Sequence, residues 1–302
     1  MERKMEQKTK AILVAANLND QEDFENSMQE LFNLSASCYI DVVGRVTQNL
    51  SRVNSGYYIG RGKLEEVLSL LDETGADLVI FNDELSPSQI RNLEAVLQCR
   101  IIDRTVLILD IFAQRAKTRE AKLQVEIAQL QYRLPRLIGL GEHLGRQGGG
   151  AGLKNRGSGE TKLELNRRKI EDRISGLTKE LETLVAQRQN QRKKRNKVEI
   201  PVIALVGYTN AGKSTIMNAM LDLYHTSAEK QVFEKDMLFA TLETSVRRIR
   251  LPDNKAFLLT DTVGFISKLP HQLVKAFRST LKEVAEADLL IHVVDYSNPN
   301  YK

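Results

Sequence analysis

One stretch of the chain, residues 207–214 with the sequence GYTNAGKS, constrains its fold more than any other. It fits G-x-x-x-x-G-K-[ST], the pattern of a phosphate-binding loop (P-loop) that follows a buried strand and opens a helix. The apolar residues 198–206 predict that strand, and residues 215–221 predict the first turns of the helix. Such a turn offers backbone N–H groups to phosphate at a helix N-terminus, where the dipole favours negative charge. We therefore expect a nucleoside triphosphate site in an α/β domain.

The side chains of this loop have predicted roles. Lys213 is expected to reach the β- and γ-phosphates, and the Ser214 hydroxyl is expected to bind Mg²⁺. A chance glycine-rich turn is the alternative, but such a turn need not match the whole pattern and both flanks. The predicted nucleotide-binding residues of this segment are Gly207, Tyr208, Thr209, Asn210, Ala211, Gly212, Lys213, Ser214 and Thr215.

A second motif lies downstream, where the apolar residues 256–260 predict a strand that runs into D-T-V-G at residues 261–264. GTPases place a metal-side element at the end of such a strand. Asp261 is expected to hold Mg²⁺ through water, and the Gly264 N–H to meet the γ-phosphate, with Thr262 and Val263 completing the contact. The ordered pair of motifs predicts GTP as substrate and GDP as product.

Between the two motifs, GTPases carry a loop whose threonine closes over Mg²⁺ and the γ-phosphate. Thr241 fits that position, and Thr244 is the alternative. The predicted metal ligands are therefore Ser214, Thr241 and Asp261, and the predicted catalytic residues are Lys213, Thr241 and Gly264.

Two further residues bear on the mechanism. Phe265 stands where many small GTPases carry a glutamine that orients the attacking water, so intrinsic hydrolysis is expected to be slow, near about 10⁻⁴ s⁻¹. Asn210 has two interpretations. It either helps to bind a potassium ion that replaces an arginine finger, or it simply suits a turn.

Residues 10–103 alternate between strand and helix patterns, which predicts a small, mostly parallel sheet in a domain of residues 1–105. Ser86, before a proline, is expected to cap the third helix. The G-R-G-K sequence at residues 60–63 could contact phosphate, but a turn with a solvated basic pair is the simpler interpretation. The expected strands are 11–15, 39–43, 78–81 and 100–102, and the expected helices are 20–34, 63–71 and 87–97.

Residues 106–197 predict a second domain, an antiparallel helical hairpin. The loop predicted at residues 139–159 holds nine of the 18 glycines and is either a flexible linker or a contact to an RNA backbone. Residues 188–197 include six basic side chains; such a run is usually a solvated face, but its place beside this loop adds support for an RNA partner. The apolar positions are Leu123, Ile127, Leu130 and Leu134 on a helix within 110–133, and Ile170, Ile174, Leu177, Leu181 and Leu184 on a helix from about 163.

Composition excludes several other classes of protein. The chain has no apolar run of 18 residues that could form a transmembrane helix, and its charged start lacks a secretory signal. Cys38 and Cys99 have no metal-type spacing and fit reduced thiols. The net charge of +5 is modest. We expect a cytoplasmic protein without a membrane span.

Several longer motifs closely resemble those of the HflX GTPases. They are DELSPSQIRNLE at 83–94, LDIFAQR at 109–115, TREAKLQVE at 118–126, RQGGG at 146–150, RGSGET at 156–161, FATL at 239–242 and DTVGF at 261–265. The resemblance runs from about residue 10 to the end of the chain. It implies a ribosome-associated GTPase that binds the large subunit and its RNA and splits stalled or idle ribosomes. It also implies that ribosome contact stimulates hydrolysis.

One departure from that pattern concerns the base. GTPases select guanine through N-K-x-D, and this motif does not occur in the 302 residues. The predicted fold is therefore α/β, with a small N-terminal α/β domain, a helical hairpin and an incomplete P-loop GTPase domain at 198–302. Guanine selectivity is expected to be weak. The alternatives are a non-catalytic RNA- or ribosome-binding module formed by residues 1–197, and an ATP-dependent RNA remodeller.

Overall fold

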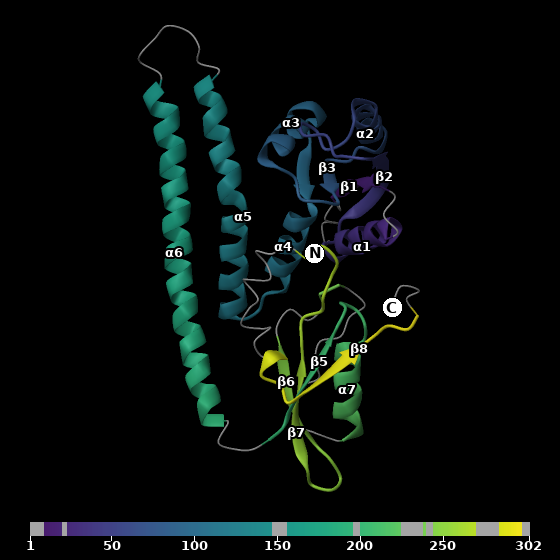
Figure 1. Cartoon of the computed structure of the whole chain (residues 1–302), viewed down its shortest axis with the longest axis vertical. Coiled ribbons are helices and arrows are strands. Elements are labelled where there is room, and N and C mark those ends of the chain that lie inside the picture. Colours follow the sequence, from purple (N-terminus) through teal and green to yellow (C-terminus); the bar gives the residue numbers. More distant parts are fainter. Residues whose placement is uncertain are drawn as a thin grey trace, which may run out of the picture. The chain divides into compact units, whose positions relative to one another are not determined.

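The computed structural model describes residues 9–19, 23–146, 156–195, 200–224, 238–239, 244–269 and 284–297 (Figure 1). The chain divides into two compact units. The first consists of Met1–Ile111 and Gln131–Glu171, and the second of Phe112–Leu130 and Asp172–Lys302. Both units contain helices and strands, so the predicted α/β class is confirmed.

The N-terminal sheet has four parallel strands in the order β2-β1-β3-β4. Ser86 caps α3 as predicted: its hydroxyl accepts the Gln89 N–H at 3.2 Å, and the Gln89 side chain accepts the Ser86 N–H at 2.9 Å. The elements are β1 (Lys10–Leu18), α1 (Phe24–Ser37), β2 (Asp41–Leu50), α2 (Arg61–Thr74), β3 (Leu78–Phe81), α3 (Pro87–Leu97) and β4 (Arg100–Asp103).

Strand β2 is longer than the predicted 39–43, because it pairs with β1 along the whole length of that strand, from Lys10 opposite Asp41 to Leu18 opposite Leu50. Its second half is largely polar and carries no strand pattern of its own. The ladder of hydrogen bonds with β1 therefore extends the strand beyond its apolar part.

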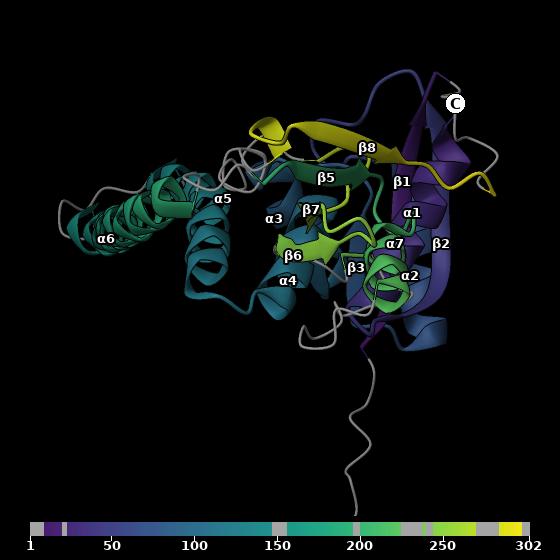
Figure 2. The same cartoon turned by 90° about the horizontal axis from the view of Figure 1, so that it is seen from below.

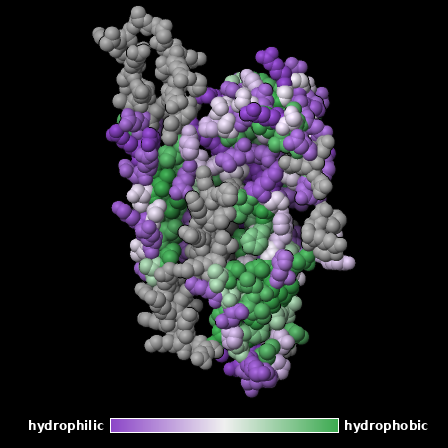
Figure 3. All heavy atoms as spheres, in the orientation of Figure 1, coloured by the Kyte–Doolittle hydropathy of each residue, from purple (hydrophilic) through white to green (hydrophobic). Residues whose placement is uncertain are grey.

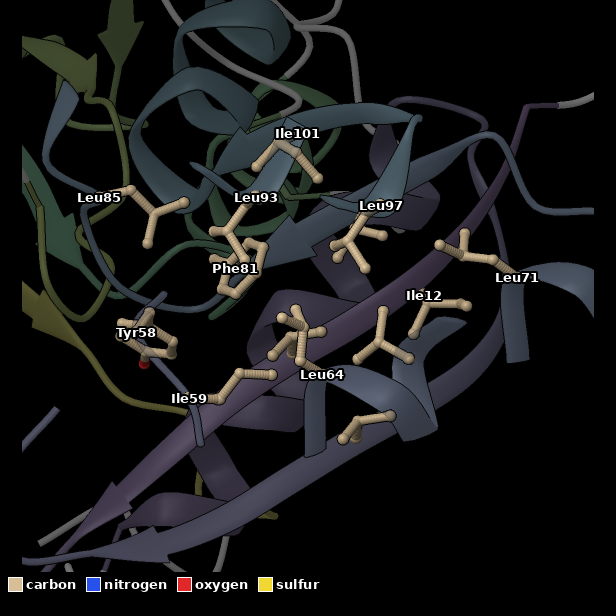
Figure 4. Packing of buried hydrophobic residues seen from close by; sticks show 14 of the residues in the cluster. Ile12, Tyr58, Ile59, Leu64, Leu71, Phe81, Leu85, Leu93, Leu97 and Ile101 are labelled. Atoms are coloured by element: carbon tan, nitrogen blue, oxygen red, sulfur yellow. The ribbon is translucent and has the colours of Figure 1, made fainter. Parts of the chain in front are cut away.

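The core of this unit lies between the sheet and helices α2 and α3 (Figure 4). Ile12 and Phe81 come from the strands, Leu64 from α2 and Leu93 from α3, and each is at most 6 % exposed. Because side chains alternate along a strand, Leu13 of β1 faces the other side, where α1 contacts β1 and β2. Both faces of the sheet are thus covered, as parallel sheets require.

Three helices follow, α4 (Arg104–Arg115), α5 (Arg119–Arg146) and α6 (Arg156–Arg195). The single helix predicted within 110–133 is wrong, because the helical segment breaks before Arg119. Thr118 explains the break, since its hydroxyl accepts the Ala121 N–H at 3.2 Å, as an N-cap residue does.

The predicted loop at residues 139–159 is also too long. Helix α5 continues through Arg146 and α6 begins at Arg156, although both ends contain glycines. Extending an existing helix by one residue is easier than nucleating one, and a glycine costs only about 1 kcal/mol relative to alanine. Residues 147–155 lie outside the described part of the chain, as do the side chains of the basic run 188–197.

Helices α5 and α6 pair in antiparallel directions, as predicted. Arg119 bonds Glu180 at 2.7 Å, whereas Glu126, further along α5, bonds the earlier residue Arg173 of α6 at 2.7 Å. Among the described residues, none of the helices is long and apolar enough to cross a membrane. The seam between the two helices is formed by Leu123, Ile127 and Leu177, with Leu130, Ile174, Leu181 and Leu184 packed against them.

The second sheet has the strand order β6-β7-β5-β8. Figure 2 shows these four strands one below the other, with β8 uppermost and β6 lowest. Strand β5 is parallel to both neighbours, and β6 is antiparallel to β7. Strand β6 was not predicted, because three of its six residues are arginines and only Ile249 is fully buried. The elements are β5 (Val202–Gly207), α7 (Lys213–Leu223), β6 (Ser245–Arg250), β7 (Ala256–Asp261) and β8 (Leu289–Val293).

The core of this sheet is small. Met217 and Leu221 of α7 pack on Leu205, Ile249 and Leu259 of the strands. At the edge, β8 exposes large apolar side chains, with Leu289 at 54 % and Leu290 at 51 %, and Figure 3 shows hydrophobic residues on the surface over this sheet.

Candidate nucleotide-binding site

The two predicted motifs meet at the carboxyl ends of adjacent parallel strands. Strand β5 ends at Gly207, α7 begins at Lys213, and β7 ends at Asp261. Leu205 of β5 pairs with Asp261 of β7, so the P-loop and the D-T-V-G segment emerge side by side. Ligands of open α/β sheets bind at this edge.

Two glycines allow the backbones to approach closely here. A β-carbon at Gly207 would lie 2.2 Å from the carbonyl oxygen of Val293 on β8, and its φ of +149° is a conformation that L side chains rarely adopt. A β-carbon at Gly264 would lie 2.3 Å from the Cα of Thr209. The site therefore requires glycine at both positions for packing, apart from any contact with nucleotide.

Lys213 is buried at the first position of α7, with 6 % of its surface exposed. Its ammonium donates to the carbonyl oxygens of Tyr208 at 2.5 Å and Gly207 at 3.2 Å. Burial lowers the pKa of Lys213, while the charge of Asp261 opposes that shift. The N-terminal end of a helix dipole also disfavours a cation. A phosphate bound against the loop would offset both costs, so the residue is poised for an anion.

Ser214 and Asp261 form the metal side of the site. The Ser214 hydroxyl donates to the Asp261 carboxylate at 2.6 Å, and Asp261 is fully buried. Mg²⁺ prefers oxygen ligands, which it binds directly or through water. This pair of oxygens thus fits Mg²⁺. Among the described residues, no group of three or more His, Cys, Asp or Glu side chains could hold a metal ion.

The D-T-V-G segment is bonded directly to the P-loop. The Thr209 N–H donates to the Phe265 carbonyl at 2.8 Å, and the Phe265 N–H donates to the Gly207 carbonyl at 3.1 Å. The Tyr208 hydroxyl lies 2.9 Å from the Ser267 hydroxyl and accepts the Ser267 N–H at 3.0 Å. Sequence reasoning missed Ser267, which follows the motif and carries no signal of its own.

The other predicted loop residues differ in what their side chains do. The Thr262 hydroxyl donates to the Leu205 carbonyl at 2.6 Å and holds β7 to β5. Asn210 is exposed and has a left-handed φ of 62°, which Asn adopts more readily than most residues, and this favours the turn interpretation. Gly212 has a φ of +93°. Thr215 is exposed, whereas Ala211 and Val263 are partly buried.

Thr241 is outside the described residues, and Thr244 directly precedes β6. Residues 61–63 of the G-R-G-K sequence form the first turn of α2, where Lys63 bonds Glu66 at 2.6 Å, and the phosphate contact stays a prediction.

Three family models match successive segments of the chain. Residues 25–113 match the family described as GTP-binding GTPase N-terminal, and residues 115–195 match GTP-binding GTPase Middle Region. Residues 202–302 match the family described as 50S ribosome-binding GTPase.

Two curated relatives are similar over almost the whole chain. The GTPase HflX of Caldanaerobacter subterraneus subsp. tengcongensis is 52 % identical over 300 residues, covering 99 % of this chain and 68 % of its own. The GTPase HflX of Alkalihalophilus pseudofirmus is 52 % identical over 292 residues, covering 96 % and 67 %. The chain thus spans about two thirds of the length of these relatives.

A solved structure shares the fold. It is a GTP-binding protein of the archaeon Sulfolobus solfataricus in complex with GDP, with 27 % identity, a TM-score of 0.50, and coverage of 95 % of this chain and 70 % of that one. Sequence, motifs and fold agree, and the chain belongs to the HflX family of P-loop GTPases.

Proposed function

We propose that the P-loop of this chain binds the phosphates of GTP and GDP, with Ser214, Asp261 and Thr241 around Mg²⁺. The observation that carries this proposal is the buried Lys213, whose ammonium lies at a helix N-terminus and donates to the carbonyl oxygens of Gly207 and Tyr208. Such a cation gains most from a bound anion, because it has already lost its water. The GDP bound to the similar Sulfolobus protein is consistent with this assignment.

Each residue of the site would have a separate role in hydrolysis. Lys213 neutralises charge on the β- and γ-phosphates, and the Gly264 N–H donates to the γ-phosphate. Ser214 and Asp261 orient the metal side, and Thr241 closes the loop over it. Mg²⁺, when bound, would supply further neutralisation of phosphate charge.

Phe265 makes the reaction slow. Its side chain is 45 % exposed and has no donor or acceptor, so it cannot orient water. Its backbone N–H and carbonyl are both bonded to the P-loop. We propose that a partner, a potassium ion bound near Asn210, or a rearranged loop provides the missing acceleration.

The proposed partner is the large ribosomal subunit and its RNA, and through this contact the chain would help to split or rescue ribosomes. Support comes from the family described as 50S ribosome-binding GTPase and from the basic sequence at residues 188–197. Phosphate contacts by basic side chains weaken steeply with salt. Co-sedimentation with large subunits at low and rising salt tests this proposal, and no binding at low salt would contradict it.

Titration with fluorescent GDP, and with ADP in parallel, tests the nucleotide site. Lys213→Ala is expected to weaken GDP binding about 10- to 100-fold, the value of one or two charge-assisted hydrogen bonds. Lys255→Ala is the control, because Lys255 is exposed in the same unit and bonds Asp253. Equal affinity of Lys213→Ala and the parent chain would rule out the proposed site. Tighter binding of ADP than GDP would favour the ATP-dependent alternative.

A further inference from the structure

Tyr208 is a P-loop residue whose side chain the proposed phosphate contacts do not use. Those contacts come from backbone N–H groups of the loop and from Lys213 and Ser214. The Tyr208 carbonyl accepts the Lys213 ammonium at 2.5 Å, whereas 41 % of the residue's surface is exposed. The role of the aromatic side chain therefore has to be found in its other contacts.

The Tyr208 hydroxyl binds Ser267, three residues after the end of the D-T-V-G segment. It accepts the Ser267 N–H at 3.0 Å and lies 2.9 Å from the Ser267 hydroxyl, within hydrogen-bond distance. Ser267 and Lys268 form a turn, in which Lys268 has a left-handed φ of 52°. A non-glycine residue keeps such a conformation only where surrounding contacts hold it. The Tyr208 hydroxyl thus ties this turn to the P-loop.

The segment from Gly264 to Ser267 lies against the P-loop along its whole length. Phe265 forms an isolated parallel bridge with Tyr208, in which its N–H donates to the Gly207 carbonyl and its carbonyl accepts the Thr209 N–H. A β-carbon at Gly264 would lie 2.3 Å from the Cα of Thr209. The bonds of Tyr208 to Ser267 therefore complete a contact that begins at Gly264.

The Gly264 N–H is the group that this contact leaves available. Gly264 is partly buried, and no residue in the described part of the chain accepts a hydrogen bond from its N–H. The next N–H, that of Phe265, is already bonded to Gly207. A donor that is held in place before its acceptor arrives needs no reorganisation on binding.

We propose that Tyr208 is a positioning residue, whose hydroxyl holds Ser267 and thereby keeps the Gly264 N–H in place for the γ-phosphate. This inference rests on the proposed function, in which that N–H meets the γ-phosphate. Without the hydroxyl, the segment would keep its two Phe265 bonds but would be freer at Ser267. Fixing it again when nucleotide binds would cost conformational entropy.

The consequence differs between the two nucleotides. GDP has no γ-phosphate for the Gly264 N–H, so the Tyr208 hydroxyl contributes little to its affinity. A GTP analogue has this phosphate and gains from a donor that is already in place. Tyr208 thus affects the ratio of the two affinities, whereas a purely structural role in the P-loop would change both affinities together.

The test measures the affinities of the 302-residue chain for fluorescent GDP and for a slowly hydrolysed GTP analogue, both with Mg²⁺. Tyr208→Phe is expected to weaken analogue binding about 2- to 10-fold, the range of one hydrogen bond, and GDP binding less than about twofold. The variant is expected to fold, because it keeps the ring and removes one oxygen from a partly exposed side chain.

Ser267→Ala tests the other partner of the contact. It removes the serine hydroxyl but keeps the N–H that donates to Tyr208, so the analogue is expected to bind only about twofold more weakly. The double variant is expected to match Tyr208→Phe alone, because both changes act on one contact. Losses that add fully in the double variant would show that Tyr208 acts without Ser267.

Tyr224→Phe is the matched control. Tyr224 ends α7 in the same compact unit and packs on the core of the second sheet. None of the described residues bonds its hydroxyl, so the same chemical change there is expected to leave both affinities unchanged.

Equal losses for GDP and the analogue, an unchanged ratio, or tighter analogue binding in Tyr208→Phe would each overturn the inference. If Tyr208→Phe does not fold, Ser267→Ala decides the question by a lowered or an unchanged ratio. Failure of the parent chain to bind either nucleotide would instead overturn the proposed function, and the role of Tyr208 with it.

Discussion

Both sheets of this chain have buried charged residues at the carboxyl ends of their parallel strands, but the partners of these residues differ. In the N-terminal sheet, Arg104 follows β4, forms an ion pair with Glu30, and donates to the Asn82 side chain at 3.0 Å. In the second sheet, Lys213 is similarly buried but donates to backbone carbonyls. A buried charge needs a partner, and the N-terminal sheet supplies one from its own chain.

The carboxylates show the same contrast. Asp103, fully buried at the end of β4, accepts the Tyr132 hydroxyl at 2.5 Å, the Arg136 guanidinium at 2.8 Å and the Leu85 N–H at 3.1 Å. Asp261, equally buried at the end of β7, accepts the Ser214 hydroxyl. Asp103 is neutralised by an arginine, whereas Asp261 and Ser214 fit an added cation. Similar sheet ends thus serve structure in one unit and binding in the other.

Replacing the two buried cations gives the largest expected difference. Arg104→Leu is expected to lower the free energy of unfolding by about 3–5 kcal/mol, because Glu30 stays buried without its partner. Lys213→Leu is expected to lower it by much less in the absence of nucleotide, because the cost of burying the ammonium, which lowers its pKa, outweighs its attraction to the charge of Asp261. Urea unfolding measures both.

A double variant provides the control for Arg104. Adding Glu30→Leu to Arg104→Leu is expected to restore much of the stability, because the unpaired charge is gone. A large loss of stability in Lys213→Leu, equal to that in Arg104→Leu, would contradict the proposed contrast between the two sheets.

Glycine substitutions give the next effect. Gly207→Ala is expected to destabilise the chain by about 1–3 kcal/mol and to weaken nucleotide binding, because its β-carbon would meet the Val293 carbonyl at 2.2 Å. Gly62→Ala in α2 is the matched control: a β-carbon there meets nothing within 4 Å, and alanine favours a helix by about 0.5–1 kcal/mol. Thermal unfolding should therefore shift in opposite directions. A stable Gly207→Ala chain would show that β8 is not packed as described.

The smallest expected effect concerns Cys99. Burial, together with the charges of Asp77 and Glu94, raises the pKa of Cys99 from 9.0 to about 11. Between these values the folded state binds more protons than the unfolded state, so stability falls as pH rises from 9.0 towards about 11. The contribution is expected to stay below about 1 kcal/mol because the thiol is only half-buried.

Unfolding of the parent chain and of Cys99→Ala at several pH values in this window isolates that contribution. GDP is expected to leave the difference between them unchanged, since the groups that raise the pKa belong to the N-terminal unit. If GDP changed the stability difference between the parent chain and Cys99→Ala, the N-terminal unit would respond to nucleotide, which would contradict the contrast between the two units.

Local patterns predicted much of the fold. The bounds of β3 and α3 were predicted in full, because the apolar run 78–81 and the Ser86 cap are local signals. The polar half of β2 and the arginine-rich β6 were not, because their strand conformation depends on pairing with β1 and β7. The break before Arg119 depended on one threonine hydroxyl, which a helical periodicity does not register.

The features of the site also fall into those that local sequence predicted and those that depend on tertiary contacts. The P-loop and the D-T-V-G segment were identified from residue types, since phosphate and Mg²⁺ chemistry needs a defined set of groups at fixed spacing. The bonds of Thr209 to Phe239 and Phe265, and of Tyr208 to Ser267, were not predictable, because they join segments that are distant in sequence. The role of Thr241 remains a proposal.

The sequence by itself determined which chemistry this chain carries: a strand, a glycine loop, a lysine and a serine in an order that suits a nucleoside triphosphate. Only the tertiary structure decided which buried charges are already paired and which are held for a ligand. Residue type fixes the charge of Arg104 and Lys213 alike. Their partners are set by the packing of strands and helices, because the desolvation and pairing of a charge depend on what surrounds it in space.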